Sequence, residues 1–264
     1  MNKILSLFIF SLFLISCSDY QKVLKSENVP EKYALAEELY KEEKYKKALN
    51  IFEQIVPKYR GKPQGERVMY YYADTYYKIG DYYLSGYQFD RFAKSYPDSD
   101  KKEEAAFKSA KSNYFLSPRF SLDQEETDMA IEKLQAFINA HPESEYIKES
   151  NDMVAELRKK KERKAYEIAK QNHHREDYKV AIATFDNYLI DYPGSPYKEK
   201  ALYYKLESQY LLAIGSYENL VKERLMVAEK YYNNYKKYYS VQGELVEKAN
   251  DIGTDITARL EQYK

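Results

Sequence analysis

The sequence predicts an all-α protein: an α-solenoid of about five antiparallel helix pairs with a C-terminal capping helix. Glycine and proline, 8 of each in 264 residues, make up about 6% of the chain, half the usual share of roughly 12%. An all-β sandwich or barrel needs far more turn residues than this. In addition, one side-chain pattern with helical spacing recurs along the chain. Because 42 basic residues balance 42 acidic ones, we expect no nucleic-acid partner.

The first residues are typical of an exported lipoprotein, and we expect residues 1–16 to be removed as a signal peptide. Lys3 precedes an apolar run, Ile4–Ile15, that would extend about 18 Å as a helix, too short for a hydrocarbon core of about 30 Å. The run ends in Leu14-Ile15-Ser16-Cys17, which resembles the bacterial lipobox. We therefore predict lipidation of Cys17, the only cysteine. The alternative is an ordinary signal peptide followed by an incidental cysteine.

Residues 17–29 are expected to form the lipidated N-terminus and a linker, with Gln21–Val29 as the linker itself. No later apolar stretch in the sequence is long enough to cross a membrane. Several acyl chains on one cysteine give stable anchoring, which a single chain does not. The sequence therefore predicts a protein that is held at a membrane, outside the cytoplasm, by its N-terminal lipid.

An internal repeat organises the rest of the chain. A small residue is followed by apolar or aromatic residues at +4 and +7 and by Tyr or His at +11, often with Pro at +12 and Ser at +14. Five segments fit, the last one weakly: Ala48, Phe52, Ile55 and Tyr59; Ser85, Phe89, Phe92, Tyr96, Pro97 and Ser99; Ala130, Leu134, Phe137, His141, Pro142 and Ser144; Ala181, Phe185, Tyr188, Tyr192, Pro193 and Ser195; Ala228, Tyr232, Tyr235 and Tyr239. Offsets of 4, 7 and 11 place these side chains on one face of a helix.

Each repeat therefore contains a helix that ends at the proline, followed by a turn and the first helix of the next unit. We expect the serine, or an adjacent aspartate, to cap that next helix, with Ser195-Pro196 as the clearest case. A second set of small residues, Ala36, Ala73 and Ala169, lies 12 positions before three of the anchors. The anchor spacings are 37, 45, 51 and 47, the first of them near the 34-residue tetratricopeptide period.

The predicted helices group into two sets of repeats. Residues 30–142 form N-terminal tetratricopeptide-like repeats, and residues 143–264 form C-terminal repeats with the capping helix. The expected helix pairs are 31–43/45–59, 65–79/81–96, 101–116/124–141, 146–172/175–192 and 197–214/217–239.

The final predicted helix, 243–263, carries one apolar stripe: Leu245, Ala249, Ile252, Ile256, Leu260 and Tyr263. We interpret it as a cap on the end of the solenoid, with a partner-docking helix as the alternative. A run of charged residues, Arg158–Lys164, covers all sides of the predicted helix 146–172. We therefore expect this stretch to be solvated and to bridge the packed regions on either side of it. A contact with acidic protein or anionic lipid is the other interpretation.

The sequence offers no constellation for catalysis. The glycines fit neither the dinucleotide fingerprint nor the P-loop, and there is no metalloprotease motif or cysteine cluster. We therefore predict no catalytic residue, no cofactor and no metal site. His173-His174 is interpreted as a pair of ordinary surface histidines, and His141 as a packing residue at a repeat tyrosine position.

A lipobox cysteine followed by about five such helix pairs resembles the BamD family, the lipoproteins of the outer-membrane β-barrel assembly machinery. The resemblance rests on Tyr96-Pro97-Asp98-Ser99, His141-Pro142-Glu143-Ser144 and Tyr192-Pro193-Gly194-Ser195, and on Asp123–Thr127 leading into the middle repeat. Cys17-Ser18-Asp19-Tyr20 is similar to the start of family members from Bacteroidetes. The resemblance covers about residues 17–240; the weak fifth repeat and the last helix lack the Tyr-Pro signature.

The resemblance implies a non-enzymatic scaffold, lipid-anchored at the periplasmic face of the outer membrane. Its C-terminal half would bind the POTRA region of a BamA-like barrel protein. Its N-terminal repeats would receive unfolded outer membrane protein substrates by their C-terminal strand signal. The alternative is another envelope tetratricopeptide lipoprotein that coordinates cell-wall synthesis or division. A glycan-capture lipoprotein fits less well because the chain has no Trp, and an enzyme is the most remote option.

The 31 tyrosines suggest where a peptide would bind. The first helices of solenoid repeats line the concave face, and tyrosine offers apolar area with a polar tip. The dense group Tyr70–Tyr72 and Tyr76-Tyr77 exceeds what one packed face can use. We predict a peptide groove on the first two such helices, formed by Tyr33, Tyr40, Arg67, Tyr70, Tyr71, Asp74 and Tyr77. The alternative is that most of these side chains only pack between helices.

Overall fold

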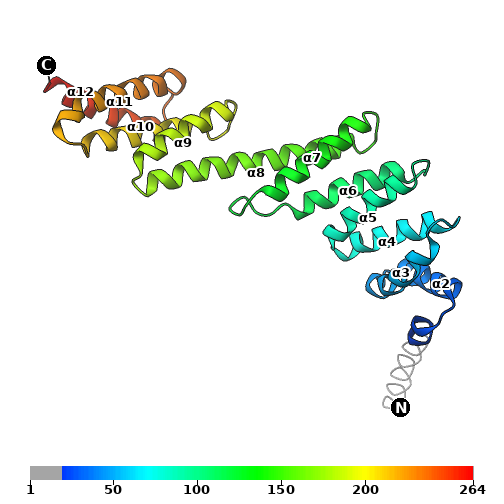
Figure 1. Ribbon diagram of the computed structural model, residues 1–264. Helices are drawn as coiled ribbons and strands as arrows, with labels where there is room; N and C mark the ends of the chain where they lie inside the picture. The colour runs from blue at the N-terminus through cyan, green and yellow to red at the C-terminus, as the bar shows by residue number, and fades with distance from the viewer. Residues whose placement is uncertain (1–19, 264) are drawn as a thin grey trace, which may run out of the picture. The chain divides into compact units, whose positions relative to one another are not determined.

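The computed structural model describes residues 20–263 and is all-helical over that range, with no strand (Figure 1). The predicted tetratricopeptide-like α-solenoid is confirmed. Helices adjacent in the chain pack against one another from α2 to α7 and again from α9 to α12. The helices are α2 (Val29–Lys41), α3 (Tyr45–Tyr59), α4 (Gly65–Ile79), α5 (Tyr82–Ser95), α6 (Lys102–Leu116), α7 (Glu125–Ala140), α8 (Ile147–His174), α9 (Tyr178–Asp191), α10 (Lys198–Ile214), α11 (Glu218–Tyr238) and α12 (Glu244–Glu261).

The prolines end the second helix of a repeat as predicted. Helices α5, α7 and α9 stop just before the Tyr-Pro or His-Pro pair. In the turn that follows, the hydroxyls of Ser99, Ser144 and Ser195 accept the backbone N–H two residues further on, at 3.0, 3.2 and 2.9 Å. The expectation that Ser195 is itself the N-cap is wrong: α10 begins at Lys198 with Tyr197 as its N-cap. The serine therefore shapes the turn before the helix.

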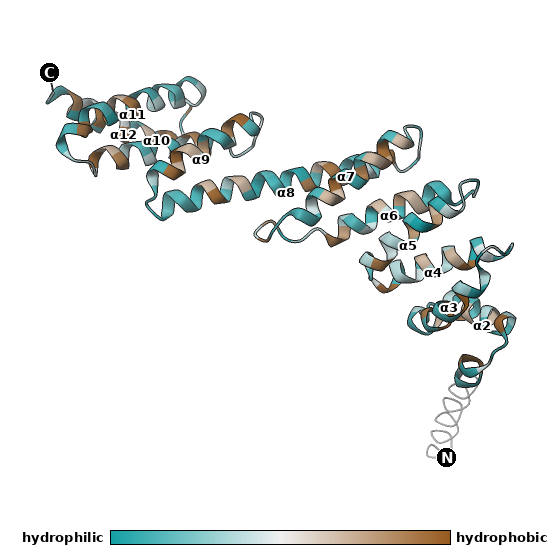
Figure 2. Ribbon diagram, in the orientation of Figure 1, coloured by the Kyte–Doolittle hydropathy of each residue, from teal (hydrophilic) through white to brown (hydrophobic). Residues whose placement is uncertain are grey.

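The repeat anchors form the core. All five small anchors are completely buried, as are the three small residues of the first helices: Ala48, Ser85, Ala130, Ala181, Ala228, Ala36, Ala73 and Ala169. Four of the five side chains at +4 are also fully buried: Phe52, Phe89, Leu134 and Phe185. Figure 2 shows the corresponding alternation of hydrophobic and hydrophilic residues along the helices. Small residues at these positions allow close helix contact while the aromatic residues fill the space between helices.

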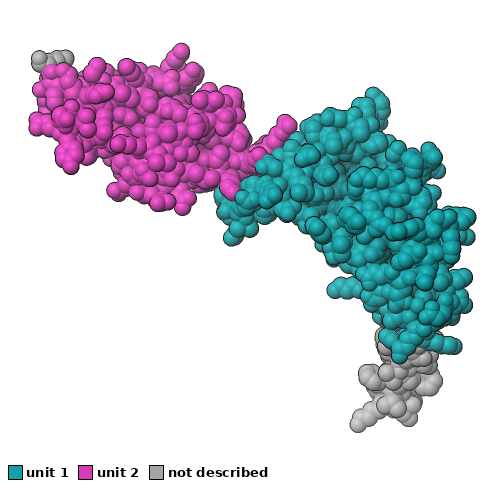
Figure 3. All heavy atoms as spheres, viewed as in Figure 1, with its two compact units in different colours: residues 1–157 teal, residues 158–264 magenta. Residues whose placement is uncertain are grey.

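The chain divides into two compact units, one up to Leu157 and one from Arg158 (Figure 3). The division falls inside α8. Met153, Val154 and Leu157 of this helix belong to the core of the first unit with α6 and α7, whereas Tyr166 and Ala169 belong to a core with α9. The charged run Arg158–Lys164 lies between these two stretches of α8. The expectation that it bridges packed regions agrees with this placement.

The beginning of the described chain corrects one expectation. Residues 20–25 are helical, although Gln21–Val29 was expected to be a linker, and Val29 already belongs to α2. Tyr20 is buried in the core formed by α2 and α3. Its hydroxyl accepts from the Asn50 amide at 3.3 Å and contacts the Lys47 carbonyl at 3.5 Å. The solenoid therefore holds the chain three residues after Cys17, which itself lies outside the described residues, as does the expected signal peptide.

Helix α12 covers the C-terminal end of the second unit, as the capping interpretation predicts. Ala249 and Ile256 are buried against α10 and α11, and the other members of the predicted stripe pack around them. Val246 is also buried there, although it was not part of the expected stripe. At Gly253 an added Cβ would lie 2.4 Å from the Tyr232 ring, so glycine allows this ring to cross α12. Within residues 20–263, none of the helices has the length and apolar character needed to cross a bilayer.

Candidate peptide-binding face

The seven predicted peptide-binding residues lie on α2 and α4, the first helices of the first two repeats. The first helix of each repeat is called its A helix, and we call the surface shared by α2, α4 and α6, the A helices of the first three repeats, the A-helix face. The five predicted tyrosines are half-buried on it, Asp74 is buried, and Arg67 is exposed. The structure connects most of these residues directly and adds partners from α6.

A row of polar side chains, here called the A-helix ladder, joins three successive repeats through Tyr40, Asp74 and Lys108. The Tyr40 hydroxyl donates to one oxygen of Asp74, and the Lys108 ammonium donates to the other at 2.6 Å. The Asp74 side chain is only 2% exposed and that of Lys108 is 20% exposed. Burial alone would lower the pKa of Lys108, but the Asp74 and Glu104 carboxylates together outweigh it and raise that pKa. The ammonium is therefore charged and paired.

A second set of contacts ties α4 to α6 beside the ladder. The Tyr70 hydroxyl donates to Glu104 at 2.6 Å, and Lys101 and Lys108 donate to the same carboxylate at 2.8 and 2.9 Å. Burial acts to raise the pKa of Glu104, but these three donors outweigh it and lower the pKa to about 2. Glu104 is therefore an ionised acceptor near neutral pH. The Tyr70 ring also packs edge-on against Phe89 and Phe92 of α5.

Arg67 is the most exposed of the predicted residues on the A-helix face. Its guanidinium donates to Glu37 of α2 and to the Tyr71 hydroxyl at 3.5 Å, and it lies 5.5 Å from the Tyr71 ring centre. Tyr71 in turn packs on Tyr40, with ring centres 4.7 Å apart. The Arg67 side chain remains 57% exposed. This corner of the face thus combines an accessible cation with aromatic area.

Tyr77 lies further along α4. Its ring packs against Tyr82 and Phe115, with centres 5.7 and 6.2 Å away, and Phe115 is itself 42% exposed. Two other members of the tyrosine group point elsewhere. Tyr76 is buried, and its hydroxyl donates to Glu53 of α3. The Tyr72 hydroxyl lies 3.1 Å from the Tyr76 hydroxyl. The tyrosine-rich stretch therefore serves both the core and the A-helix face.

The sequence prediction missed the α6 partners, Glu104 and Lys108, and also Glu37. A signal for the first two was present. Tyr40 to Asp74, Asp74 to Lys108 and Tyr70 to Glu104 are each separated by 34 residues, which is the tetratricopeptide period. Residues one period apart occupy equivalent positions on neighbouring first helices. A search for complementary polar residues at that spacing would have found the ladder.

One histidine differs from expectation. His174 is exposed as predicted, but His173 is buried, so the surface interpretation of His173 is wrong. Its ring nitrogens lie 2.9 Å from the Ser208 hydroxyl and 3.1 Å from the Glu207 carboxylate. Hydrogen bonds from His173 and Tyr203 lower the pKa of Glu207 against the effect of its burial. These contacts tie α8 to α10 within the second unit. No group of metal-ligating side chains occurs among residues 20–263.

The fold and this face define a helical-repeat protein whose aromatic and charged residues lie on neighbouring first helices, and stacked repeats of this class form extended binding surfaces. The model of the YfiO family, described as outer membrane lipoprotein, matches residues 26–225. The chain belongs to the YfiO family of outer membrane lipoproteins. Members of this family are typically non-enzymatic scaffolds.

Two solved structures that match this chain are of the nearly identical TPR-like repeats of a protein from Podosopora anserina described as a kinesin light chain. Each is 11% identical to this chain. The two alignments cover 87% and 89% of this chain and 96% and 98% of the other, with TM-scores of 0.33 and 0.32.

Proposed function

We propose that this protein is a scaffold of the outer membrane β-barrel assembly complex. It binds unfolded outer membrane protein substrates and a BamA-like barrel protein, and it promotes barrel insertion. The observation that carries the proposal is the YfiO family match over residues 26–225. The A-helix face, which joins the first three repeats, supports it.

In this proposal a lipid on Cys17 holds the protein at the periplasmic face of the outer membrane. The membership in an outer membrane lipoprotein family supports this, as does the lipobox-like sequence before Cys17. Because Tyr20 is fixed in the first core, the anchor and the first repeat stay close together. The substrate-binding repeats would then work near the membrane surface.

The A-helix face is the proposed substrate site. Asp74 accepts hydrogen bonds from both Tyr40 and Lys108, so the role of Asp74 and Tyr40 is to hold α2, α4 and α6 in register. Arg67 and the half-buried Tyr70, Tyr71 and Tyr77 retain accessible surface, and they would contact the peptide. An extended strand with alternating aromatic residues matches partly exposed tyrosine rings, and Arg67 offers a partner for a terminal carboxylate.

The second unit is the proposed docking site for the POTRA region of the barrel protein. It carries large apolar side chains that are far more exposed than usual, with Tyr217 at 85%, Val241 at 83% and Ile190 at 75%. Aromatic residues such as Tyr217 are enriched at the cores of protein interfaces. The proposal assigns substrate binding to the first unit and the barrel partner to the second.

Photo-crosslinking tests the substrate site. A photoreactive residue at position 67 should crosslink a synthetic peptide that matches the C-terminal strand of an outer membrane β-barrel. The same residue at Tyr83, which is 73% exposed on α5 and outside the A-helix face, is the matched control and should give little product. We expect Tyr70→Ala combined with Tyr77→Ala to reduce crosslinking at position 67 by about tenfold, because stacking area is lost.

Since Tyr70 and Tyr77 also pack in the fold, circular dichroism must show that the double variant keeps its helix content. Undiminished crosslinking in a folded double variant would exclude this face as the substrate site. Equal crosslinking from positions 67 and 83 would show that the peptide binds without preference for the A-helix face.

A further inference from the structure

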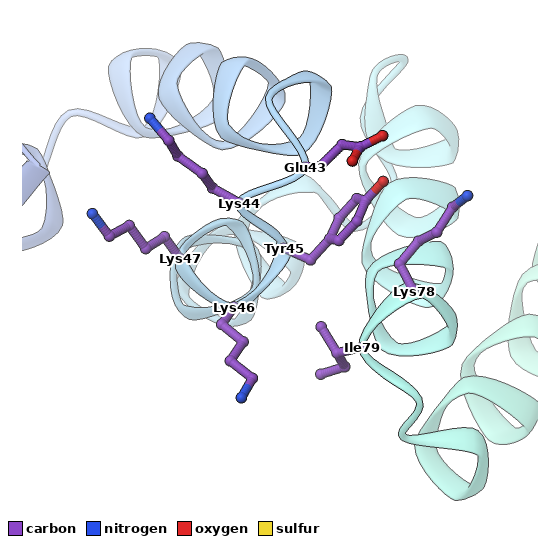
Figure 4. A pocket seen from close by; sticks show the side chains of 7 residues that line it. All are labelled: Glu43, Lys44, Tyr45, Lys46, Lys47, Lys78 and Ile79. Carbon is purple, nitrogen blue, oxygen red and sulfur yellow. The ribbon is translucent and has the colours of Figure 1, made fainter.

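A shallow hollow of about 500 Å³ lies between the α2–α3 turn, the start of α3 and the end of α4. It adjoins one end of the A-helix ladder, because the ring centre of its lining residue Tyr45 is 5.5 Å from that of Tyr40. Its lining consists of Glu43, Lys44, Tyr45, Lys46, Lys47, Lys78 and Ile79 (Figure 4). We call this surface the lysine patch. All four of its lysines are exposed, and Glu43 is the only acidic residue of the lining, with Glu42 beside it.

The ammonium groups of the lysine patch are poorly neutralised by the protein. Lys44 pairs with Glu42 at 2.8 Å. Within residues 20–263, no carboxylate lies at ion-pair distance from Lys46, Lys47 or Lys78. Helix α3 also starts here, with no acidic residue in its first turn and no side-chain cap. The positive end of its dipole adds to the lysine charges instead of offsetting them.

The patch lies next to the N-terminal attachment point of the chain. The Lys47 ammonium is 5.4 Å from the Tyr20 ring centre, and Tyr20 is buried against α3. Cys17 is three residues earlier, and three extended residues reach at most about 11 Å. A lipid on Cys17 would therefore keep Tyr20 within about 11 Å of the anchor, a distance similar to the Debye length of roughly 8–10 Å, and Tyr20 is in contact with Lys47 of the patch.

The arrangement of the side chains favours a broad surface over a single bound ion. In Figure 4 the lysines point in different directions: Lys44 and Lys47 to one side, Lys46 away from both, and Lys78 beyond Tyr45. Their ammonium groups do not converge on one point, as they would around a phosphate. Tyr45 and Ile79 add aromatic and apolar surface between the charges, which suits a membrane interface.

We infer that the lysine patch binds the anionic lipid headgroups of the membrane in which the lipid on Cys17 is inserted. The inference rests on the proposed lipid anchor. Lysines near an anionic surface each strengthen binding about fivefold, and an acyl anchor combined with a basic patch binds more firmly than either alone. The patch would hold the first repeat against the membrane, so that the substrate-binding repeats start at a fixed height above it.

The experiment measures how fast each lysine reacts with an acetylating reagent in the intact lipoprotein, purified from membranes and reconstituted into vesicles. Vesicles of phosphatidylcholine alone are compared with vesicles that also contain phosphatidylglycerol. We expect Lys46, Lys47 and Lys78 to react at least about threefold more slowly in the anionic vesicles, and about 0.5 M salt to remove the difference. Lys94 and Lys148 are exposed internal controls and should react equally in both.

A charge variant sharpens the test. In Lys46→Gln combined with Lys78→Gln, the protection of Lys47 should fall toward its value in neutral vesicles. Lys94→Gln combined with Lys148→Gln removes the same charge elsewhere and should leave Lys47 protected. Equal reaction rates of the three patch lysines in both kinds of vesicle would overturn the inference.

Flotation of the same samples separates this inference from the proposed anchor. A lipidated protein floats with neutral vesicles whether or not the lysine patch binds. Protein that floats only with anionic vesicles would support the patch and contradict the lipid anchor. Protein that floats with both, but without lysine protection, would leave the anchor intact and reject the patch.

Discussion

Replacing Asp74 with alanine should lower the free energy of unfolding of the first unit by about 3 kcal/mol. The substitution leaves the Lys108 ammonium without its buried partner and removes the acceptor of the Tyr40 hydroxyl. Removing one member of a buried pair has a large cost because the other charge stays desolvated. Glu104 still contacts Lys108 at 2.9 Å, so we expect the loss to lie at the lower end of the range for such pairs. Urea denaturation followed by circular dichroism measures it.

Asp90→Ala is the matched control for Asp74→Ala. Asp90 pairs with Lys94 on α5, but the two side chains are 42% and 74% exposed. Exposed pairs contribute at most about 1 kcal/mol, so this variant should be nearly as stable as the wild type. Equal destabilisation by the two substitutions would contradict the structural role of the A-helix ladder.

Phe185→Ala should destabilise the second unit by about 3–5 kcal/mol. Phe185 is the +4 residue of the fourth repeat and is completely buried between α8, α9 and α10. Truncation removes its buried apolar area and leaves a cavity that a rigid helix stack cannot close. The thermal unfolding transition of the second unit is the measurement.

The control for Phe185→Ala is Val180→Ala on the same helix. Val180 is 45% exposed, so its truncation should change stability by less than about 0.5 kcal/mol. If Phe185→Ala proves as mild as Val180→Ala, the repeat pattern does not define the core.

The helices and the core were predictable because both follow from local chemistry. Small residues with aromatic side chains at +4 and +7 leave only one face that can be buried, and proline ends the second helix of a repeat. The structure buries Ala130 and Leu134 completely, as this pattern requires. Such positions can be inferred without knowing which helices are neighbours.

The features that sequence reasoning missed depend on contacts between distant parts of the chain. Tyr20 precedes any repeat signal, and its burial depends on a space beside α3. His173 is buried because Glu207 and Ser208 of α10 face it, and neither is marked by a motif. Lys108 looks like an ordinary surface lysine until α4 places Asp74 opposite it.

The A-helix face lies between these two cases. Its tyrosines were visible as a surplus on α4, and their place on a first helix was predictable from the repeat. Their partners became visible only through the 34-residue spacing, whereas the first two core anchors, Ala48 and Ser85, are 37 residues apart. The difference of three residues is just under one helical turn. The polar partners thus have a spacing of 34 residues and these core anchors a spacing of 37, so the two patterns are separate sequence signals within one repeat.

The measurement that tests the proposed function most directly is the abundance of outer membrane β-barrel proteins after depletion of this protein. If it is a scaffold of barrel assembly, many unrelated barrels should decline together while other envelope lipoproteins stay at normal levels. A normal set of barrels accompanied by a defect in cell division would contradict the account and favour a role in cell-wall synthesis or division.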